Sequence, residues 1–89
     1  MTSRSVQVVN RLGMHARAAA KFVHLAGQYQ SQVKVARQGR QMDGKSIMGL
    51  LLLSAPRGAE IVIVADGPDE AAAVDALGEL VTRGFDEEG

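Results

Sequence analysis

The hydrophobic pattern of this sequence changes its period repeatedly, and the order of these changes limits the fold more than any other feature. Alternating or β-branched apolar residues predict four strands, at about residues 5–9, 32–36, 40–42 and 60–65. Three helices are predicted, over 16–26, over 47–53 and after the Pro- and acid-rich segment 66–70. The elements therefore follow the order βαββαβα. We expect an α+β fold of two layers, with helices on one face of the sheet and solvent on the other.

The two longer helices show which of their residues should be buried. In the first helix one apolar stripe contains Ala18, Phe22, Leu25 and Ala26. In the last helix the buried stripe contains Val74, Leu77 and Val81. A second stripe of the first helix should face outward and contains Arg17, Ala20, Lys21 and His24. The acidic tail from Phe85 to Gly89 is expected to fray.

Size and composition indicate a single domain spanning residues 1–89. The chain is 46% apolar and has no cysteine, so it should fold without disulfides, and a thiolate zinc site or cysteine catalysis is excluded. The polar start, Met1 to Ser5, contains no signal-peptide core, and the apolar run Ile47 to Leu53 is far too short to span a bilayer. We expect a cytoplasmic monomer without membrane contact.

Charge is balanced overall but unevenly distributed. Ten basic and ten acidic residues give a formal net charge of zero. All the basic residues except Arg83, but only Asp43 among the acids, precede Gly58. This asymmetry predicts a basic face that meets an acidic protein partner. Nucleic acid is the weaker alternative, because the chain has few aromatic side chains to stack on bases, and we expect none to bind.

His15 is the residue best suited to chemistry. It follows the Gly13 loop and precedes a predicted helix, whose first N–H groups lack internal partners and carry partial positive charge. Such a helix start binds anions, and Arg17 can direct its guanidinium onto phosphate oxygens. The same field disfavours the imidazolium form, so a neutral His15 can attack phosphorus, and the N–H groups of Ala16 and Arg17 can hold the product. The alternative is that His15 merely caps the helix.

His24 does not belong to the same centre. At a rise of ~1.5 Å per residue, the helix separates it from His15 by about 13 Å, so the two cannot share a metal ion. We expect no metal site. His24 is either a solvated helix residue or part of a partner contact.

Ser46 marks a second point of interest, at the start of the 47–53 helix. Its hydroxyl should cap the N–H of Met48 or Gly49, which is a structural role. A phosphate here would also be favoured by the helix end, so Ser46 is a candidate regulatory site. One interpretation of the apolar residues of this helix is that Leu50 and Leu53 belong to the core and that the exposure of the others is incidental. An exposed apolar patch for protein contact is expected from Ile47, Met48 and Leu51.

The sequence lacks the residue sets of most enzymes. It contains no Ser/His/Asp set, no evident pair of catalytic carboxylates, no P-loop and no zinc-ligand spacing. A lone surface nucleophile on so small a domain suits a carrier rather than an enzyme, and no cofactor is expected. Two alternatives are a regulatory module whose anion site only binds a partner's acidic group, and a small-ligand-binding domain.

Two segments resemble HPr, the family of histidine-containing phosphocarriers of the bacterial phosphotransferase system. Asn10 to Ala19 resembles the family's active-site segment, and Gly44 to Gly49 resembles its regulatory-serine segment, at the matching separation. The resemblance covers nearly the whole chain. It implies an open-faced β-sandwich, a four-stranded antiparallel sheet covered on one face by three helices.

The resemblance also implies roles and partners. Enzyme I, charged by phosphoenolpyruvate, would phosphorylate Nδ1 of His15, with Arg17 beside the phosphate, and the phosphoryl group would pass to an Enzyme IIA protein or domain. HPr kinase/phosphorylase would act on Ser46. The shared docking face would contain Arg17, Ala20, Lys21, His24, Ile47, Met48 and Leu51.

Departures from the family pattern concern three places. Ala18 stands where many members have proline, a change that a helix tolerates. His24 stands where lysine is frequent, so docking charge there would depend on pH. The tail from Gly84 to Glu88 is similar to the nitrogen-related paralogue NPr, whereas Lys45 to Met48 resembles HPr proteins phosphorylated on serine. A nitrogen-related regulatory phosphorelay is therefore an alternative to sugar uptake.

Overall fold

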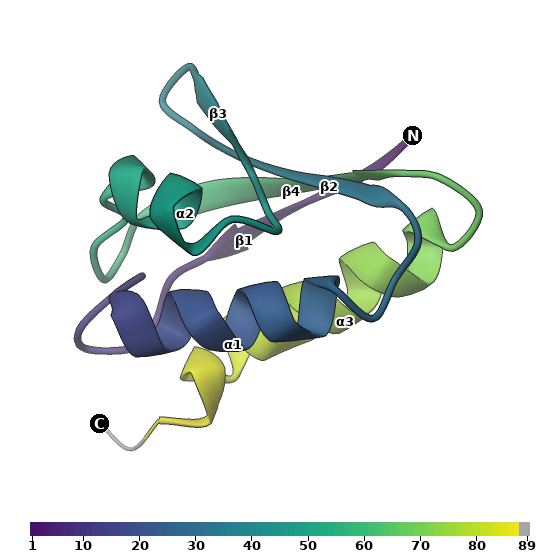
Figure 1. Cartoon of the computed structure of the whole chain (residues 1–89). Coiled ribbons are helices and arrows are strands. Elements are labelled where there is room, and N and C mark those ends of the chain that lie inside the picture. The colour runs from purple at the N-terminus through teal and green to yellow at the C-terminus, as the bar shows by residue number, and fades with distance from the viewer. Residues whose placement is uncertain (88–89) are drawn as a thin grey trace.

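The computed structural model describes residues 1–87, which form one sheet with helices packed against it (Figure 1). The strands are β1 (Thr2–Gln7), β2 (Gln32–Arg37), β3 (Arg40–Asp43) and β4 (Glu60–Asp66). The helices are α1 (Ala16–Ala26), α2 (Ile47–Leu53) and α3 (Glu70–Thr82), followed by the 3₁₀ turn η1 (Gly84–Asp86). The predicted order of elements is confirmed, and α1 and α2 have the predicted bounds. Within the described residues, no helix has both the length and the apolar character needed to cross a bilayer.

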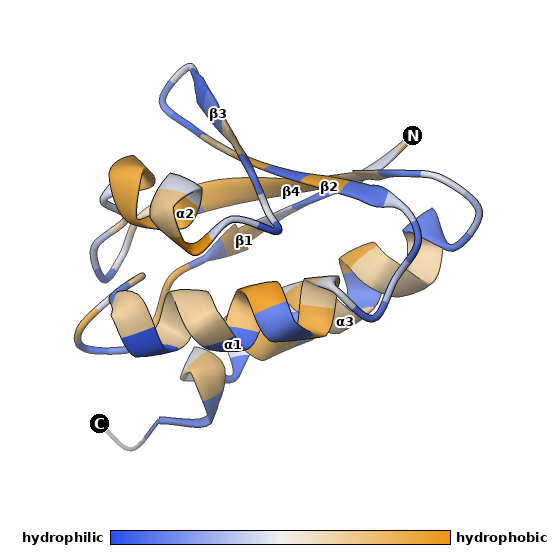
Figure 2. Ribbon diagram, in the orientation of Figure 1, coloured by the Kyte–Doolittle hydropathy of each residue, from blue (hydrophilic) through white to orange (hydrophobic). Residues whose placement is uncertain are grey.

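The sheet is antiparallel throughout, with the spatial order β1-β4-β2-β3. Alternation along β4 sorts its side chains, because Ile61 and Ile63 are fully buried while Val62 and Val64 project to the opposite, more exposed face. Figures 1 and 2 show α1 and α3 together on one side of the sheet, and the residues that the two helices bury are mostly apolar. The open-faced, two-layer α+β fold is therefore confirmed.

β1 begins and ends earlier than predicted. It pairs with β4 from Thr2↔Ala65 to Gln7↔Glu60, whereas the apolar pattern had suggested a strand at about 5–9. Val8 is fully buried, but its backbone N–H and C=O bond to Ala59 and Gly58, in the loop before β4. The apolar pattern thus indicates which residues are buried, and burial continues beyond Gln7, where the regular pairing of β1 with β4 ends.

The predicted helix stripes are largely confirmed. Ala18, Phe22 and Ala26 of α1 are fully buried, and the three predicted residues of α3 are buried too. Leu25 is only half-buried and packs against the edge of the core. The start of α3 also differs from the prediction, because Pro68 precedes the N-cap residue Asp69 and does not occupy the first turn.

The C-terminal tail does not fray at residues 85–87, which corrects the prediction. Phe85 is fully buried, and its carbonyl accepts a hydrogen bond of 2.7 Å from Nζ of Lys21 in α1. Phe85 and Asp86 both have positive φ angles, 58° and 59°, which turn the chain back beneath the start of α1 (Figure 1). The prediction was based on the acidic residues of the tail and did not consider that Phe85 could anchor it in the core. The rest of the predicted tail, residues 88–89, lies outside the described residues.

Asp69 ties the start of α3 to the loop between α1 and β2. Its carboxylate accepts hydrogen bonds from the N–H groups of Gln30 and Ser31, each at 2.9 Å, and from the Ser31 hydroxyl. Ser31 is fully buried. Its hydroxyl, and then the backbone N–H of Gln30, hold the pKa of Asp69 below the ordinary value of 3.8.

The substitution Asp69→Asn should lower the midpoint of thermal unfolding at neutral pH, because it removes the charge that these donors stabilise. A depressed folded-state pKa means that the ionised group stabilises the fold above about pH 4, and that this is lost as pH falls through the folded pKa. The difference in unfolding midpoint between wild type and Asp69→Asn should therefore be large at neutral pH and shrink towards about pH 2. Asp75→Asn, on the exposed side of α3, is the control. A difference for Asp69→Asn that stays constant across this range would contradict the prediction.

Candidate functional site

His15 is the N-cap residue of α1, with extended backbone (φ −78°, ψ 178°), and its carbonyl accepts the first helical bond, from Ala19 N–H at 2.8 Å. Its imidazole makes no capping hydrogen bond. The N–H groups of Ala16 and Arg17 consequently find no acceptor among residues 1–87. The His15 side chain therefore does not cap the helix, and the helix start is left free to bind an anion.

The loop before His15 is held by a backbone contact with Ala55 and by a hydrogen bond from the Asn10 side chain. Gly13 has a φ of +67°, and a Cβ on it would lie 2.5 Å from the Ala55 carbonyl oxygen. The next residue, Met14, donates its N–H to that same oxygen at 2.9 Å, and its side chain is buried. Asn10 donates from Nδ2 to the Gly13 carbonyl at 2.8 Å. Only glycine fits at position 13, and this close approach sets where α1 begins.

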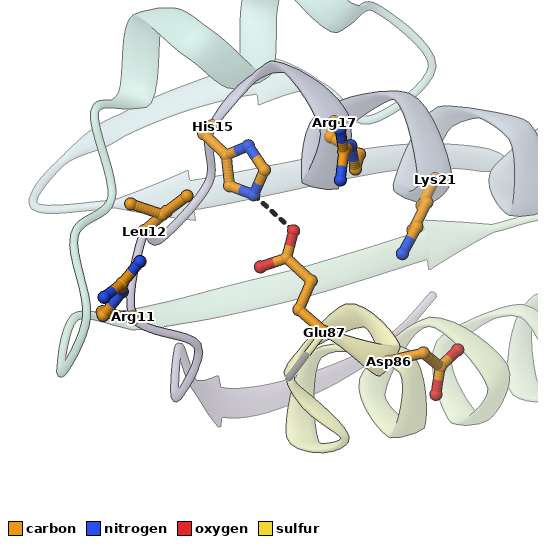
Figure 3. Close-up of a pocket in the computed structure, with 7 residues that line it drawn as sticks. All are labelled: Arg11, Leu12, His15, Arg17, Lys21, Asp86 and Glu87. Carbon is orange, nitrogen blue, oxygen red and sulfur yellow. Dashed lines mark hydrogen bonds and ion pairs between the residues drawn. The ribbon is translucent and has the colours of Figure 1, made fainter. Parts of the chain in front are cut away.

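Glu87, from the far end of the described chain, contacts the His15 ring. Its Oε2 lies 2.5 Å from His15 Nε2, and its Oε1 accepts a hydrogen bond of 2.8 Å from Asn10 Nδ2 (Figure 3). Burial opposes ionisation of Glu87, but the hydrogen bonds from Asn10 and His15, with the charge of Lys21 nearby, outweigh burial and hold its pKa below 4.5. Glu87 was not predicted as a site residue. Phe85, the only large apolar residue after α3, was the signal that the tail is anchored near α1.

These groups surround an open depression of about 480 Å³. The contacting side chains of His15 and Glu87 form one part of its lining, with Arg17 and Lys21 projecting from successive turns of α1 (Figure 3). The complete lining is Arg11, Leu12, His15, Arg17, Lys21, Asp86 and Glu87. Arg17 is exposed and makes no ion pair within the described part of the chain, so its guanidinium is free to bind an anion. Lys21 is already committed to the Phe85 carbonyl, a contact that its predicted outward position did not indicate.

Ser46 and α2 lie beside α1, outside this depression (Figure 1). The Ser46 Oγ accepts a hydrogen bond of 3.0 Å from the N–H of Gly49, so the predicted cap is confirmed. Leu50 and Leu53 are buried. The exposed apolar residues of α2 are Ile47, Met48 and Leu52, at 42%, 67% and 51% exposure, whereas Leu51 is half-buried. Leu52 thus belongs to the exposed apolar surface that was predicted without it.

The other two residues of the predicted outward stripe are exposed. Ala20 and His24 both lie on the solvent side of α1, and neither lines the depression around His15. Among residues 1–87 no three His, Cys, Asp or Glu side chains are grouped in a way that could hold a metal ion.

Comparison with known proteins points to one family. Residues 2–83 match the family model for the HPr component phosphorylation site of the phosphotransferase system. The chain is 49% identical over 87 residues to the phosphocarrier protein HPr of Cupriavidus necator, covering 98% of each chain, and 44% identical to that of Neisseria meningitidis at the same coverage. The fold is similar to an HPr structure from Thermoanaerobacter tengcongensis, with a TM-score of 0.96 and 36% identity over the full length of both chains. It is also similar to an HPr dimer from that organism, with a TM-score of 0.78 and 36% identity over 98% of this chain and all of that one.

The close approach of Gly13 to Ala55 gives a direct test of how the site is held. Gly13→Ala should destabilise the fold by about 1–3 kcal/mol, because the new Cβ adds backbone strain at positive φ and overlaps the Ala55 carbonyl. Gly39→Ala is the matched control, since Gly39 also has a positive φ, +81°, but open space around it. Chemical denaturation of both variants measures the difference. Equal losses would show that the contact with Ala55 does not hold the loop.

Proposed function

This chain belongs to the HPr family and is a phosphocarrier of the phosphotransferase system, without turnover of its own. From that premise we propose that Nδ1 of His15 is the atom that accepts the phosphoryl group. The observation that carries the proposal is the uncapped start of α1, where His15 stands beside free N–H groups and an open, largely basic depression. His15 also lies within the segment matched by the family model.

The geometry supports both halves of a carrier's task. A neutral imidazole attacks phosphorus through a nitrogen lone pair, and the anionic oxygens of the product meet the N–H groups of Ala16 and Arg17. The exposed guanidinium of Arg17 adds a fork of donors at the same place. Because the site is open to solvent, these interactions stabilise the phosphoryl group only moderately, and it can be passed on.

We propose Enzyme I as the donor and an Enzyme IIA protein or domain as the receiver, which the family implies. Both would dock on the surface formed by α1 and α2, where basic and apolar side chains lie next to one another. The proposed docking residues are Arg17, Ala20, Lys21, His24, Ile47, Met48 and Leu51. Exposed Met48 would enter the partner's surface, while the charge on α1 would attract acidic groups. The carrier would act in the cytoplasm as a monomer.

Ser46 is the proposed regulatory site, modified by HPr kinase/phosphorylase. Its side chain is half-buried and its hydroxyl oxygen accepts from Gly49 N–H, so a phosphate there would lie at the start of α2, next to the exposed Ile47 and Met48. Added negative charge at that place would repel an acidic partner and leave the fold in place.

Incubation of the full chain with its cognate Enzyme I and phosphoenolpyruvate should yield an acid-labile, base-stable phosphoryl adduct. The adduct should be absent in His15→Ala, while Arg17→Ala should slow its formation about tenfold or more through loss of one charged anion contact. His24→Ala is the control histidine variant and should still accept phosphate. Mass spectrometry and ³¹P NMR measure the adduct. An adduct that persists in His15→Ala would overturn the assignment.

A second test concerns Ser46. Ser46→Asp should retain the fold and slow phosphorylation of His15, whereas Ser46→Asn, which offers a comparable cap without the charge, should transfer at nearly the wild-type rate. We expect the ratio of the two rates to be about tenfold at low salt and to shrink as salt is added. Equal rates for the two variants at low salt would contradict the proposed repulsion.

A further inference from the structure

Glu87 is the acid that contacts the nucleophile, and it reaches His15 from the opposite end of the sequence. The side chains are partly shielded from solvent, with exposures of 26% for His15 and 15% for Glu87. The Glu87 carboxylate meets Nε2 of the ring, the nitrogen that is not proposed to accept phosphate. Figure 3 shows Nδ1 on the edge of the ring away from Glu87. The contact therefore leaves the reactive nitrogen unobstructed.

The position of Glu87 is fixed by more than this single contact. Phe85 anchors the tail in the core, and Lys21 holds the Phe85 carbonyl from α1. Asn10 then bridges the loop and the tail, because its Nδ2 donates both to the Gly13 carbonyl and to Glu87 Oε1. A glutamate on a frayed tail would not be held in this way, so the carboxylate is presented to the ring by the fold.

The hydrogen-bond roles follow from Asn10 and from the ring. Asn10 directs its amide nitrogen at two acceptors, and its buried Oδ1 has no partner within residues 1–87, so the reverse orientation would set oxygen against oxygen. Glu87 therefore acts as an acceptor towards Asn10. An ionised carboxylate has no proton to donate, so the hydrogen in the contact with His15 must belong to Nε2.

We propose that Glu87 is a positioning residue for phosphoryl transfer, which keeps the proton on Nε2 of His15 and thereby leaves the lone pair on Nδ1 free to attack phosphorus. The proposal rests on the proposed function of His15. It adds to that function a carboxylate that sets the tautomer and the orientation of the nucleophile. It also gives the C-terminal segment a function, because the anion-binding groups at the helix start do not depend on that segment.

The transfer step balances with these groups alone. The Nδ1 lone pair forms the new N–P bond, and the donor's bond to phosphorus breaks, with its electron pair leaving on the donor. Nε2 keeps its proton, so the ring becomes a phosphorylated imidazolium whose positive charge is paired with Glu87. When the phosphoryl group passes on, the N–P electron pair returns to Nδ1 and the ring is neutral again. Pairing of the ring charge with Glu87 should favour formation of the adduct. Because it keeps the proton on Nε2, the pairing also retains the charged ring, which leaves phosphorus more readily than an unprotonated ring would.

The test compares Glu87→Gln with Asp86→Asn in the full chain. Asp86 is the neighbouring acid on the same turn, but its carboxylate pairs with Arg83 at 3.0 Å. Figure 3 shows the Asp86 side chain directed away from His15. Each variant removes one negative charge from the same segment, so general effects on an anionic donor are matched. Long-range ¹H–¹⁵N NMR of the two ring nitrogens, recorded at rising pH until the spectrum stops changing, measures the tautomer of the neutral ring directly. The initial rate of phosphorylation by phosphoramidate, a small donor that needs no partner protein, measures the chemistry.

We expect wild type and Asp86→Asn to show Nε2 as the protonated nitrogen and Nδ1 as the unprotonated one. In Glu87→Gln the two ring signals should move towards each other as the tautomers mix, and the rate should fall about three- to tenfold relative to Asp86→Asn. Unchanged ring signals in Glu87→Gln would overturn the proposal, and so would an equal rate for the two variants. Because the NMR measurement needs no phosphoryl donor, it tests Glu87 even if the Enzyme I assay fails to phosphorylate His15.

Discussion

The packing of α1 through small side chains is the constraint on which the rest of the structure depends. Ala18, Ala19 and Ala26 are fully buried around a single large residue, Phe22, so the helix lies close to the core along its length. Such close packing fixes the helix axis and leaves little freedom to tilt. The start of α1 therefore has a definite place at the surface. The loop contact between Gly13 and Ala55 then sets His15 at that start.

This arrangement separates the stable part of the molecule from the reactive part. The core residues of α1 lie on one side of the helix, and Arg17 and the free N–H groups lie on the other, where water can compete with every contact they make. A carrier needs that combination. A fully enclosed phosphate would be held too strongly to be passed on, whereas a site on a flexible loop would not orient the imidazole.

The C-terminal tail places the negative charge of Glu87 beside an anion-binding site, so the position of this charge matters. Glu87 would oppose phosphate if it occupied the helix start. It lies instead on the Nε2 side of the ring, where Asn10 also holds it. In the proposed reaction, the helix start and Arg17 would bind the phosphoryl oxygens on Nδ1, whereas Glu87 would balance the positive charge of the ring at Nε2. The basic groups at the helix start and the acidic Glu87 thus lie near different nitrogens of the same His15 ring.

Local features of the fold and site were predictable, and contacts between distant segments were not. The bounds of α1 and α2 and the Ser46 cap all have signatures within a few residues, and each is present. The pairing of β1 with β4 and the contact of Glu87 with His15 join segments far apart in the sequence, and no spacing rule encodes them. The exposure of Leu52 and the half-burial of Leu51 depend on how a one-sided short helix is rotated against its neighbours, which its nearly uniform apolar sequence leaves undetermined.

Ala18 suits its place at the same helix start. Proline at a third helical position loses no intrahelical bond, because the first N–H groups of a helix have no internal acceptor. Alanine at this place therefore costs the helix nothing and retains an N–H that proline lacks. No acceptor for the Ala18 N–H lies among residues 1–87, and the imidazole of His15 does not cap it. The side chain of Ala18 is fully buried, so its small size also suits the close packing of α1. Ala18 thus leaves one more backbone donor in the first turn of α1 than proline would, without disturbing the packing that holds the turn in place.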